Sequence, residues 1–294
     1  MEIFKEFTVE IVYIVLAILI LLVGKVTLNI LTPYKIDDEL TAKDNPAFGI
    51  SITGYYLGIL IIFIGASIGE FKTDEIWSST MYFEILKDFG WAMVGIVLLN
   101  FSRLFVDKLI FSKFSTRKEI IEDRNAGMGA SEFGVYIASA LILAGAISGD
   151  GTATGLGKMG NFITVPAFFL LGIAGFIISG WVYQLITKYD FHKEIEADNV
   201  AAGVAYGGKC IAIGIIMMKA VSGDFVSWEE NLMQFGWYFF CSIFLIIAGR
   251  IAIGLVLMPK SDTYKEIVED RNLNAGLLEG GIVAGLAAVI SILL

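Results

Sequence analysis

Hydrophobic and polar positions form long separate blocks along the chain rather than a fine alternation. A helix needs about 20 mostly apolar residues to cross a lipid bilayer. Eight stretches meet that length: residues 8–31, 47–69, 90–111, 126–148, 161–186, 200–221, 234–258 and 273–294. The pattern therefore predicts an all-α integral membrane protein with eight transmembrane helices.

The second half of the chain repeats the first. The run KEIIEDRN at 118–125 returns as KEIVEDRN at 265–272. Arg103 and Arg250 stand at the same distance before these two runs. Self-similarity at a long, fixed interval indicates a duplicated structural unit. We expect two four-helix membrane halves related by tandem duplication, at residues 1–150 and 151–294.

A shorter repeat lies inside each half. An asparagine follows an acidic stretch, opens every second helix, and is followed four and nine residues later by glycine. The four copies of this motif are Asn45, Gly49 and Gly54; Asn125, Gly129 and Gly134; Asn199, Gly203 and Gly208; and Asn272, Gly276 and Gly281. Because the motif opens every second helix, each repeating unit contains two helices, and the chain is expected to contain four parallel two-helix repeats.

Two faces of the motif helices carry different residues. Positions two, six, nine and thirteen after the asparagine share one stripe at about 100° per residue. The stripe is made mostly of small residues: Ala47, Ser51, Gly54, Gly58; Gly127, Ser131, Gly134, Ala138; Ala201, Ala205, Gly208, Ala212; and Asn274, Leu278, Gly281, Gly285. Small residues let helix backbones approach closely in lipid, so the stripe predicts helix packing.

The asparagine lies on the opposite face and has two interpretations. It is well placed as an N-cap, whose side-chain oxygen accepts a hydrogen bond from an orphan amide of the first turn. Alternatively, the four asparagines and the four helix N-termini line a cytoplasmic entrance.

Five ionisable residues within the spans are the main candidate site. Glu132 and Glu279 occupy the same motif position in repeats two and four, and Arg103 and Arg250 lie at a comparable depth. Lys209 lies one turn beyond that position in repeat three. Charges at such depth pair with one another or face water. One interpretation is two buried bridges, Arg103 with Glu132 and Arg250 with Glu279. The other is a charged constriction that binds ions.

Composition narrows the function classes. Hydrophobic residues make up 56% of the chain, and the net charge of −9 argues against nucleic acid, which requires a basic surface. His192 is the only histidine, while Cys210 and Cys241 lie in apolar runs without metal-ligand spacing. No nucleophile–base pair, phosphate-binding loop or dinucleotide fingerprint is visible. We therefore expect no enzyme activity, no metal and no cofactor.

The combined pattern resembles a known family. An acidic loop, then Asp or Arg followed by Asn, then glycine-rich residues opening a span, is similar to the bacterial inner-membrane family typified by YjfL, labelled domain of unknown function 350. Its short members look like four-helix proteins with the motif twice. The resemblance covers nearly the whole chain and implies a fused, double-length member in the bacterial inner membrane, without catalytic residues. The glycine-rich connection at 149–160 is longer than the tight connections of the other repeats, and two former chains would join there.

Two functions are compatible with these features. The favoured hypothesis is a channel or carrier for small ions, preferably cations, in which four hairpins around an axis along the membrane normal enclose a path. Acidic motif loops would then concentrate cations at its entrance. The alternative is a non-conducting membrane scaffold or stress-response partner that binds a peripheral protein or lipid. The expected partners are the lipid bilayer, possible small ions and a possible second copy of the chain.

Lysine and arginine placement predicts the orientation. The motif loops and their flanks carry most of these residues, for example Lys35, Arg117 and Lys260. Cytoplasmic loops of membrane proteins are enriched in positive charge. We therefore expect the motif loops in the cytoplasm and both termini outside.

Cysteine labelling tests this orientation. A cysteine introduced at Ser115 or Ser261 should react with a membrane-impermeant maleimide only after the cells are opened. A cysteine at Thr154 should react in intact cells, because it lies on the opposite side. Labelling of the Ser115 variant in intact cells would show that the orientation is reversed.

Overall fold

The computed structural model describes residues 2–67 and 78–293. Eight of its helices are long and apolar enough to cross a membrane, which confirms the predicted number of spans. They are α1 (Glu2–Leu31), α2 (Pro46–Ser67), α3 (Ser79–Leu109), α4 (Ala126–Ile147), α5 (Asn161–Ile186), α7 (Val200–Val221), α8 (Trp228–Ala252) and α9 (Leu273–Leu293). The described part of the chain contains no strand. The predicted span ends at 69 and 294 lie outside the described residues.

The connections contain short helical elements. Three π-helical turns precede motif helices, and the short helix α6 takes that place in the third repeat. These elements are η1 (Asp38–Ala42), η3 (Lys118–Glu122), η7 (Lys265–Glu269) and α6 (Phe191–Glu196). A further π-helical turn, η6 (Ile253–Leu257), continues α8, and two 3₁₀ turns, η4 (Thr152–Thr154) and η5 (Gly157–Gly160), lie in the glycine-rich connection.

Two helices begin well before their apolar stretches. The predicted starts at 90 and 234 are wrong, because α3 begins at Ser79 and α8 at Trp228. Serine caps fix both starts: Ser78 accepts a hydrogen bond from Met81 N at 3.3 Å, and Ser227 from Glu230 N at 3.1 Å. Charged residues near these starts lower the hydropathy there, Glu84 and Lys87 in α3 and Glu229 and Glu230 in α8, so a search for apolar runs misses them.

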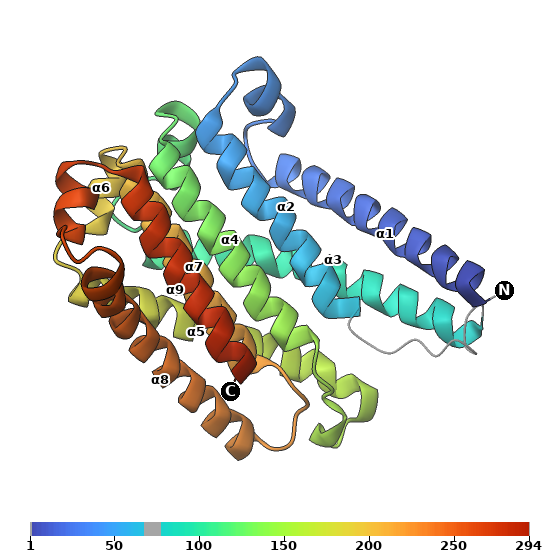
Figure 1. The fold of residues 1–294 in the computed structure, drawn as a ribbon. Coiled ribbons are helices and arrows are strands. Elements are labelled where there is room, and N and C mark those ends of the chain that lie inside the picture. Colours follow the sequence, from blue (N-terminus) through green and yellow to red (C-terminus); the bar gives the residue numbers. More distant parts are fainter. Residues whose placement is uncertain (1, 68–77, 294) are drawn as a thin grey trace.

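The second helix of every repeat belongs to one row. These motif helices are α2, α4, α7 and α9, and α2 packs on α4, α4 on α7, and α7 on α9, more extensively than any other pairs do. Figure 1 shows the row running from α2 (blue) through α4 (green) to α9 (red). The two halves of the chain meet inside it, where α4 packs on α7. The order in space is therefore the order in sequence.

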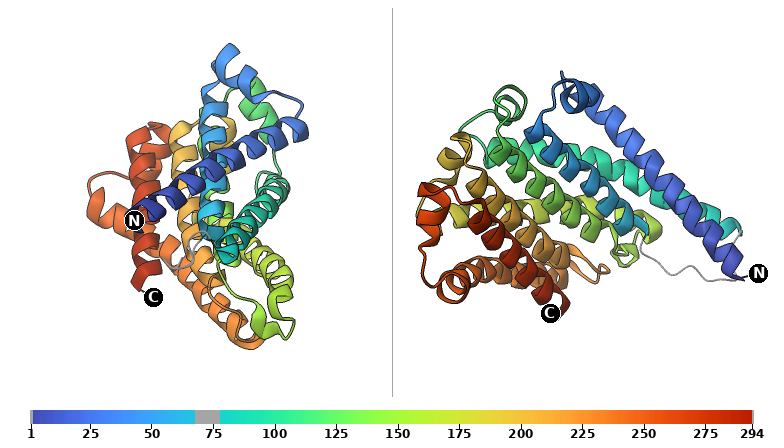
Figure 2. Two further views of the ribbon diagram at one scale, coloured as in Figure 1. Left: turned by 90° about the vertical axis from the view of Figure 1, so that its right-hand side faces the viewer. Right: turned by 45° about the horizontal axis from the view of Figure 1, so that its top comes forward.

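The first helix of every repeat covers this row. These leading helices are α1, α3, α5 and α8, and consecutive members contact one another. Each later member lies in the groove between two motif helices: α3 on α2 and α4, α5 on α4 and α7, α8 on α7 and α9. The first member, α1, packs on α2 and α3 and crosses the end of the row obliquely (Figure 2).

The row is open. Figures 1 and 2 place α2 and α9 at its opposite ends, so the four repeats of one chain do not close around a central axis. The expectation of a ring of hairpins is therefore wrong for a single chain. The row stays open because of the angle between the two faces through which each inner motif helix contacts its neighbours. This angle places successive repeats side by side.

Glycine brings the motif helices into backbone contact. A Cβ added at Gly54 would lie 2.7 Å from Phe133 Cα in α4, and one at Gly145 would lie 2.5 Å from the Met218 carbonyl oxygen in α7. The small-residue stripe thus packs helices, as predicted, in repeats one to three. For the fourth repeat the prediction is wrong within the described chain, because a Cβ added at Gly281 or Gly285 would meet no described atom within 4 Å outside its own helix.

The two ends of the bundle differ in character. The motif loops gather at one end, and both termini lie toward the other (Figure 1). The acidic loops therefore share one end of the bundle, as the repeat requires, while the side of the membrane they face stays a prediction.

Candidate functional site

Every motif helix starts at its asparagine. Asn45 Oδ1 accepts a hydrogen bond from Phe48 N at 3.1 Å, and Asn125 Oδ1 from Met128 N at 2.9 Å. The same cap recurs at Asn199 with Ala202 N, 3.2 Å, and at Asn272 with Asn274 N, 3.0 Å. The N-cap interpretation is confirmed.

The side-chain amide nitrogen of each asparagine also donates hydrogen bonds. It donates to the glutamate of its own loop, as Asn125 does to Glu119 at 2.9 Å. In the first three repeats it also donates to a backbone carbonyl of the next repeat. These bonds are Asn45 to Ile120, 2.9 Å; Asn125 to Ile195, 2.6 Å; and Asn199 to Ile267, 2.8 Å. These three amides are buried and engaged, so they do not line an open entrance.

A strained residue precedes each asparagine. The φ angles are 47° at Asp44, 55° at Arg124, 55° at Asp198 and 48° at Arg271. Left-handed backbone at the end of a helical turn is normally supplied by glycine. Here the left-handed residue reverses the chain direction, so that the backbone N–H of the asparagine donates to a carbonyl of the preceding loop. Asn45 N, for example, donates to the Glu39 carbonyl oxygen at 3.0 Å.

The first buried charge cluster joins α2, α3 and α4. Arg103 Nε lies 3.1 Å from Glu132 Oε1 and 3.7 Å from Asp107 Oδ2. Ser51 Oγ, from α2, donates to the other oxygen of Glu132. Asp107 accepts a hydrogen bond from Thr116 Oγ1 at 3.1 Å. The predicted pair of Arg103 and Glu132 is confirmed.

The second cluster uses a different cation. Lys209 Nζ, from α7, pairs with Glu279 Oε1 from α9 and donates to the Tyr183 hydroxyl at 2.8 Å. Lys209 and Glu279 are each 3% exposed. The Arg250 side chain lies outside the described residues, so the predicted pair of Arg250 and Glu279 is untested. Sequence reasoning named Lys209 but not its partner.

Both intramembrane glutamates therefore have a cationic partner. Glu132 faces Arg103 and Glu279 faces Lys209, and each pair links a motif helix to another helix of the bundle. Among the described residues, no group of three or more His, Cys, Asp or Glu side chains is placed to hold a metal ion. These contacts favour the interpretation of Glu132 and Glu279 as structural bridges.

A cavity adjoins the first cluster. Its volume is about 450 Å³, and it lies between the loop end of α1 and α3. Apolar side chains form much of its wall, including Leu28, Val97 and Leu104. Its polar lining includes Arg103, Asp107 and Arg117. Sequence reasoning missed this cavity, because α1 and α3 come together only in the fold.

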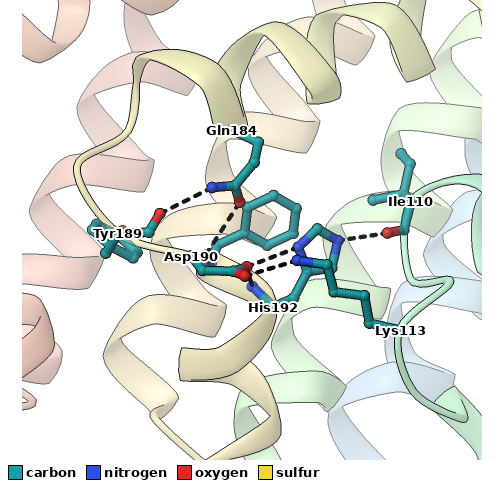
Figure 3. A network of polar contacts seen from close by, with 7 residues as sticks. Ile110, Lys113, Gln184, Tyr189, Asp190 and His192 are labelled. Atoms are coloured by element: carbon teal, nitrogen blue, oxygen red, sulfur yellow. Dashed lines mark hydrogen bonds and ion pairs between the residues drawn. The ribbon is translucent and has the colours of Figure 1, made fainter.

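A polar network outside the spans ties the two halves together. Asp190 caps α6 through His192 N at 3.0 Å and accepts from Lys113 Nζ at 2.7 Å, while His192 Nε2 lies 2.6 Å from the Ile110 carbonyl oxygen (Figure 3). Burial alone would raise the pKa of the Asp190 carboxyl, but hydrogen bonds from Lys113 and His192 outweigh it and lower the pKa to about 2. The only histidine of the chain thus docks the third repeat on the second.

Comparisons with known proteins agree with this repeat. The family described as Domain of Unknown Function (DUF350) matches residues 2–147 and again 158–294. A UPF0719 transmembrane protein of Aquifex aeolicus is 25% identical over 252 residues, covering 83% of this chain and 84% of that protein. The UPF0719 transmembrane protein YshE of Bacillus subtilis is 25% identical over 131 residues, covering 92% of that protein but 45% of this chain. No solved structure matches.

Removing one partner of a buried pair tests the two clusters. Glu132→Gln leaves Arg103 without its buried counter-charge, and such losses cost ~3–5 kcal/mol of unfolding free energy. Glu279→Gln should act similarly through Lys209. The double variants Arg103→Gln/Glu132→Gln and Lys209→Gln/Glu279→Gln should recover part of each loss, measured as the unfolding temperature in detergent.

Glu84→Gln provides the matched control. Glu84 pairs with Lys87 at the surface of α3, so its loss should change stability by no more than about 1 kcal/mol. Strictly additive losses in both double variants would contradict the pairing.

Proposed function

The chain belongs to the family described as Domain of Unknown Function (DUF350), and we propose that it acts as a non-conducting, non-catalytic membrane scaffold that binds the anionic headgroup of a lipid. That the protein is a multi-pass membrane protein follows from its eight spans and its transmembrane relatives. Binding of a lipid headgroup would be the activity of this scaffold within the bilayer.

The cavity between α1 and α3 is the observation that carries the proposal. Its volume, about 450 Å³, is in the range of small-molecule and cofactor sites. Leu31, Phe101 and Leu104 line it and are each more than half exposed, so its wall is continuous with the lipid-facing surface. An acyl chain would therefore meet an apolar wall.

The polar end of the cavity favours an anion. Arg103 is paired with Glu132, whereas Arg117, at the start of η3, is exposed and forms no ion pair with a described residue. A guanidinium can donate two parallel hydrogen bonds to phosphate oxygens. An anionic headgroup would thus bind Arg117, while its acyl chain follows Leu28 and Leu31.

The packing of the motif helices supports the non-conducting character of the proposed scaffold. Their backbones touch at glycine, and the carboxylates of Glu132 and Glu279 are each paired with a cation. An ion crossing between them would have to break a buried ion pair and separate a pair of helices in backbone contact.

A cation path remains the second candidate. Two glutamates recur at the same motif position and both are buried within the spans. Acidic loops lie at the neighbouring end of the bundle. Glu279 Oε2 accepts no hydrogen bond from a described group, so one oxygen is left for a proton or a small cation.

Lipid retention tests the scaffold proposal. The protein reconstituted with phosphatidylglycerol and phosphatidylcholine should retain the anionic lipid preferentially in native mass spectrometry. Arg117→Gln should lower that retention about five-fold, since one basic residue near an anionic surface contributes about 1 kcal/mol. Lys118→Gln is the matched control, because Lys118 is on the same turn but pairs with Asp123. Equal retention by wild type and Arg117→Gln would exclude this site.

Ion flux separates the two candidates. Vesicles containing the purified chain should show no more cation flux than empty vesicles under a voltage or a pH gradient. Flux that disappears in a folded Glu132→Gln/Glu279→Gln variant would overturn the scaffold proposal in favour of the cation path.

A further inference from the structure

We propose that copies of this chain assemble head to tail in the membrane, with α9 of one copy packed against α2 of the next. The occupant of both open ends of the row is thus a second copy of the chain. The inference goes beyond lipid binding and does not depend on it.

One interface is built three times inside the chain. The second motif glycine of one helix packs on the backbone of the next motif helix. The contacted residue is the one just before the second motif glycine of that next helix. These contacts are Gly54 on Phe133, Gly134 on Gly207, and Gly208 on Gly280. The first motif glycine of each following helix lies in turn against the preceding one: Gly129 on Ala47, Gly203 on Gly127, and Gly276 on Ala201. Each motif helix therefore has a forward face and a backward face that fit each other.

A hydrogen bond marks the same interface. Asn45, Asn125 and Asn199 each donate from the forward face to a carbonyl of the following repeat, over 2.6–2.9 Å. The interface is thus defined by polar groups as well as by shape.

Helix α9 presents a forward face that no other described motif helix covers. Gly281 stands where Gly54 stands in α2, yet an added Cβ would meet no described atom within 4 Å outside its own helix, and the same holds for Gly285. The Asn272 side-chain amide donates to Glu266 of its own loop at 2.8 Å, and no described backbone carbonyl accepts a second hydrogen bond from it. This face is the fourth copy of a surface that is covered in the other three repeats.

Helix α2 presents the matching backward face. The nearest atom to a Cβ added at Gly49 is Leu40 Cδ2 of its own repeat, at 3.9 Å. Thr53, equivalent to Phe133, is exposed, and Ile64 further along is 60% exposed. The Leu40 carbonyl takes the place of the Ile120 carbonyl, and no described side chain donates to it. The Asn272 side-chain amide of another copy could donate a hydrogen bond to this carbonyl.

The position of α1 agrees with a missing neighbour. The other leading helices each lie on two motif helices, whereas α1 has only α2. Only 17% of its most apolar stretch is buried. An α9 from a second copy, set beside α2, would supply the other wall of its groove.

Lipid alone does not complete these faces. Acyl chains can cover Leu277 or Ile64, but they offer the Asn272 amide no acceptor and do not fill the flat surface at Gly281 as a helix backbone does. Because the two faces are different surfaces of one chain, the contact is heterologous and leads to a ring or a continuing row.

Cross-linking tests the contact directly. In membranes, Thr53→Cys/Gly281→Cys should give a ladder of dimers, trimers and larger species on mild oxidation. Each single variant should give none, which also controls for Cys210 and Cys241. Leu170→Cys/Gly281→Cys is the matched control, since Leu170 is exposed on α5 away from both ends. A dimer formed by Gly281→Cys alone, or no ladder when both cysteines react with maleimide, would overturn the proposal.

Bulky substitutions test it without cross-linking. Gly281→Phe should yield monomers of unchanged unfolding temperature, because no other described element of the same chain occupies the space beside Gly281. Gly49→Phe should act the same way from the other face, because a Cβ at the equivalent Gly129 would lie 2.4 Å from the Ala47 carbonyl oxygen, whereas Gly49 meets only Leu40 Cδ2 at 3.9 Å. Gly236→Phe, at an equally open site on α8, should leave the assembly intact.

A mixture gives the sharpest outcome. Each of the two monomeric variants keeps one intact face, so mixing Gly281→Phe with Gly49→Phe should give a heterodimer and nothing larger. Wild-type protein that is monomeric in bilayers, or a Gly281→Phe variant that assembles like wild type, would contradict head-to-tail assembly.

Discussion

Backbone contact between consecutive motif helices organises the molecule. Helices in lipid gain little from hiding apolar side chains, so they associate through close packing and hydrogen bonds. Glycine at Gly54, Gly134 and Gly208 permits the packing, and the preceding asparagines add a bond from each helix start to the next repeat. Because the contact always joins a forward face to a backward face, repetition produces a row, and its two outer faces stay open.

The buried charges follow from this row but differ between the halves. The glutamate of the second repeat reaches Arg103 on the leading helix beside it, whereas that of the fourth reaches Lys209 on the preceding motif helix. A cation can thus come from either side of a glutamate that the motif holds in one place. This difference suits charges that lock neighbouring helices together better than a symmetric ion pathway.

The sequence predicted the local structure well and the arrangement of the repeats poorly. Eight spans, the asparagine caps and the pair of Arg103 and Glu132 were all confirmed. Hydropathy, helix capping and the depth of a charge within a span depend on residues close together in sequence, so the sequence alone predicts them. The open row was not foreseen. It depends on the angle between two faces of each motif helix, and four parallel repeats suit a ring equally well. The pairing of Lys209 with Glu279 was not foreseen, since Lys209 belongs to a repeat without a glutamate at that position.

The distance between the two ends of the row tests this account most directly. Spin labels at Ile50 of α2 and Leu277 of α9 occupy the same motif position on exposed surfaces. Doubly labelled chains, diluted into unlabelled chains so that only distances within one chain are seen, should give roughly 25–30 Å, from three helix spacings of 8–10 Å each. A distance of about 10 Å would mean that the repeats close into a ring and would contradict the open row.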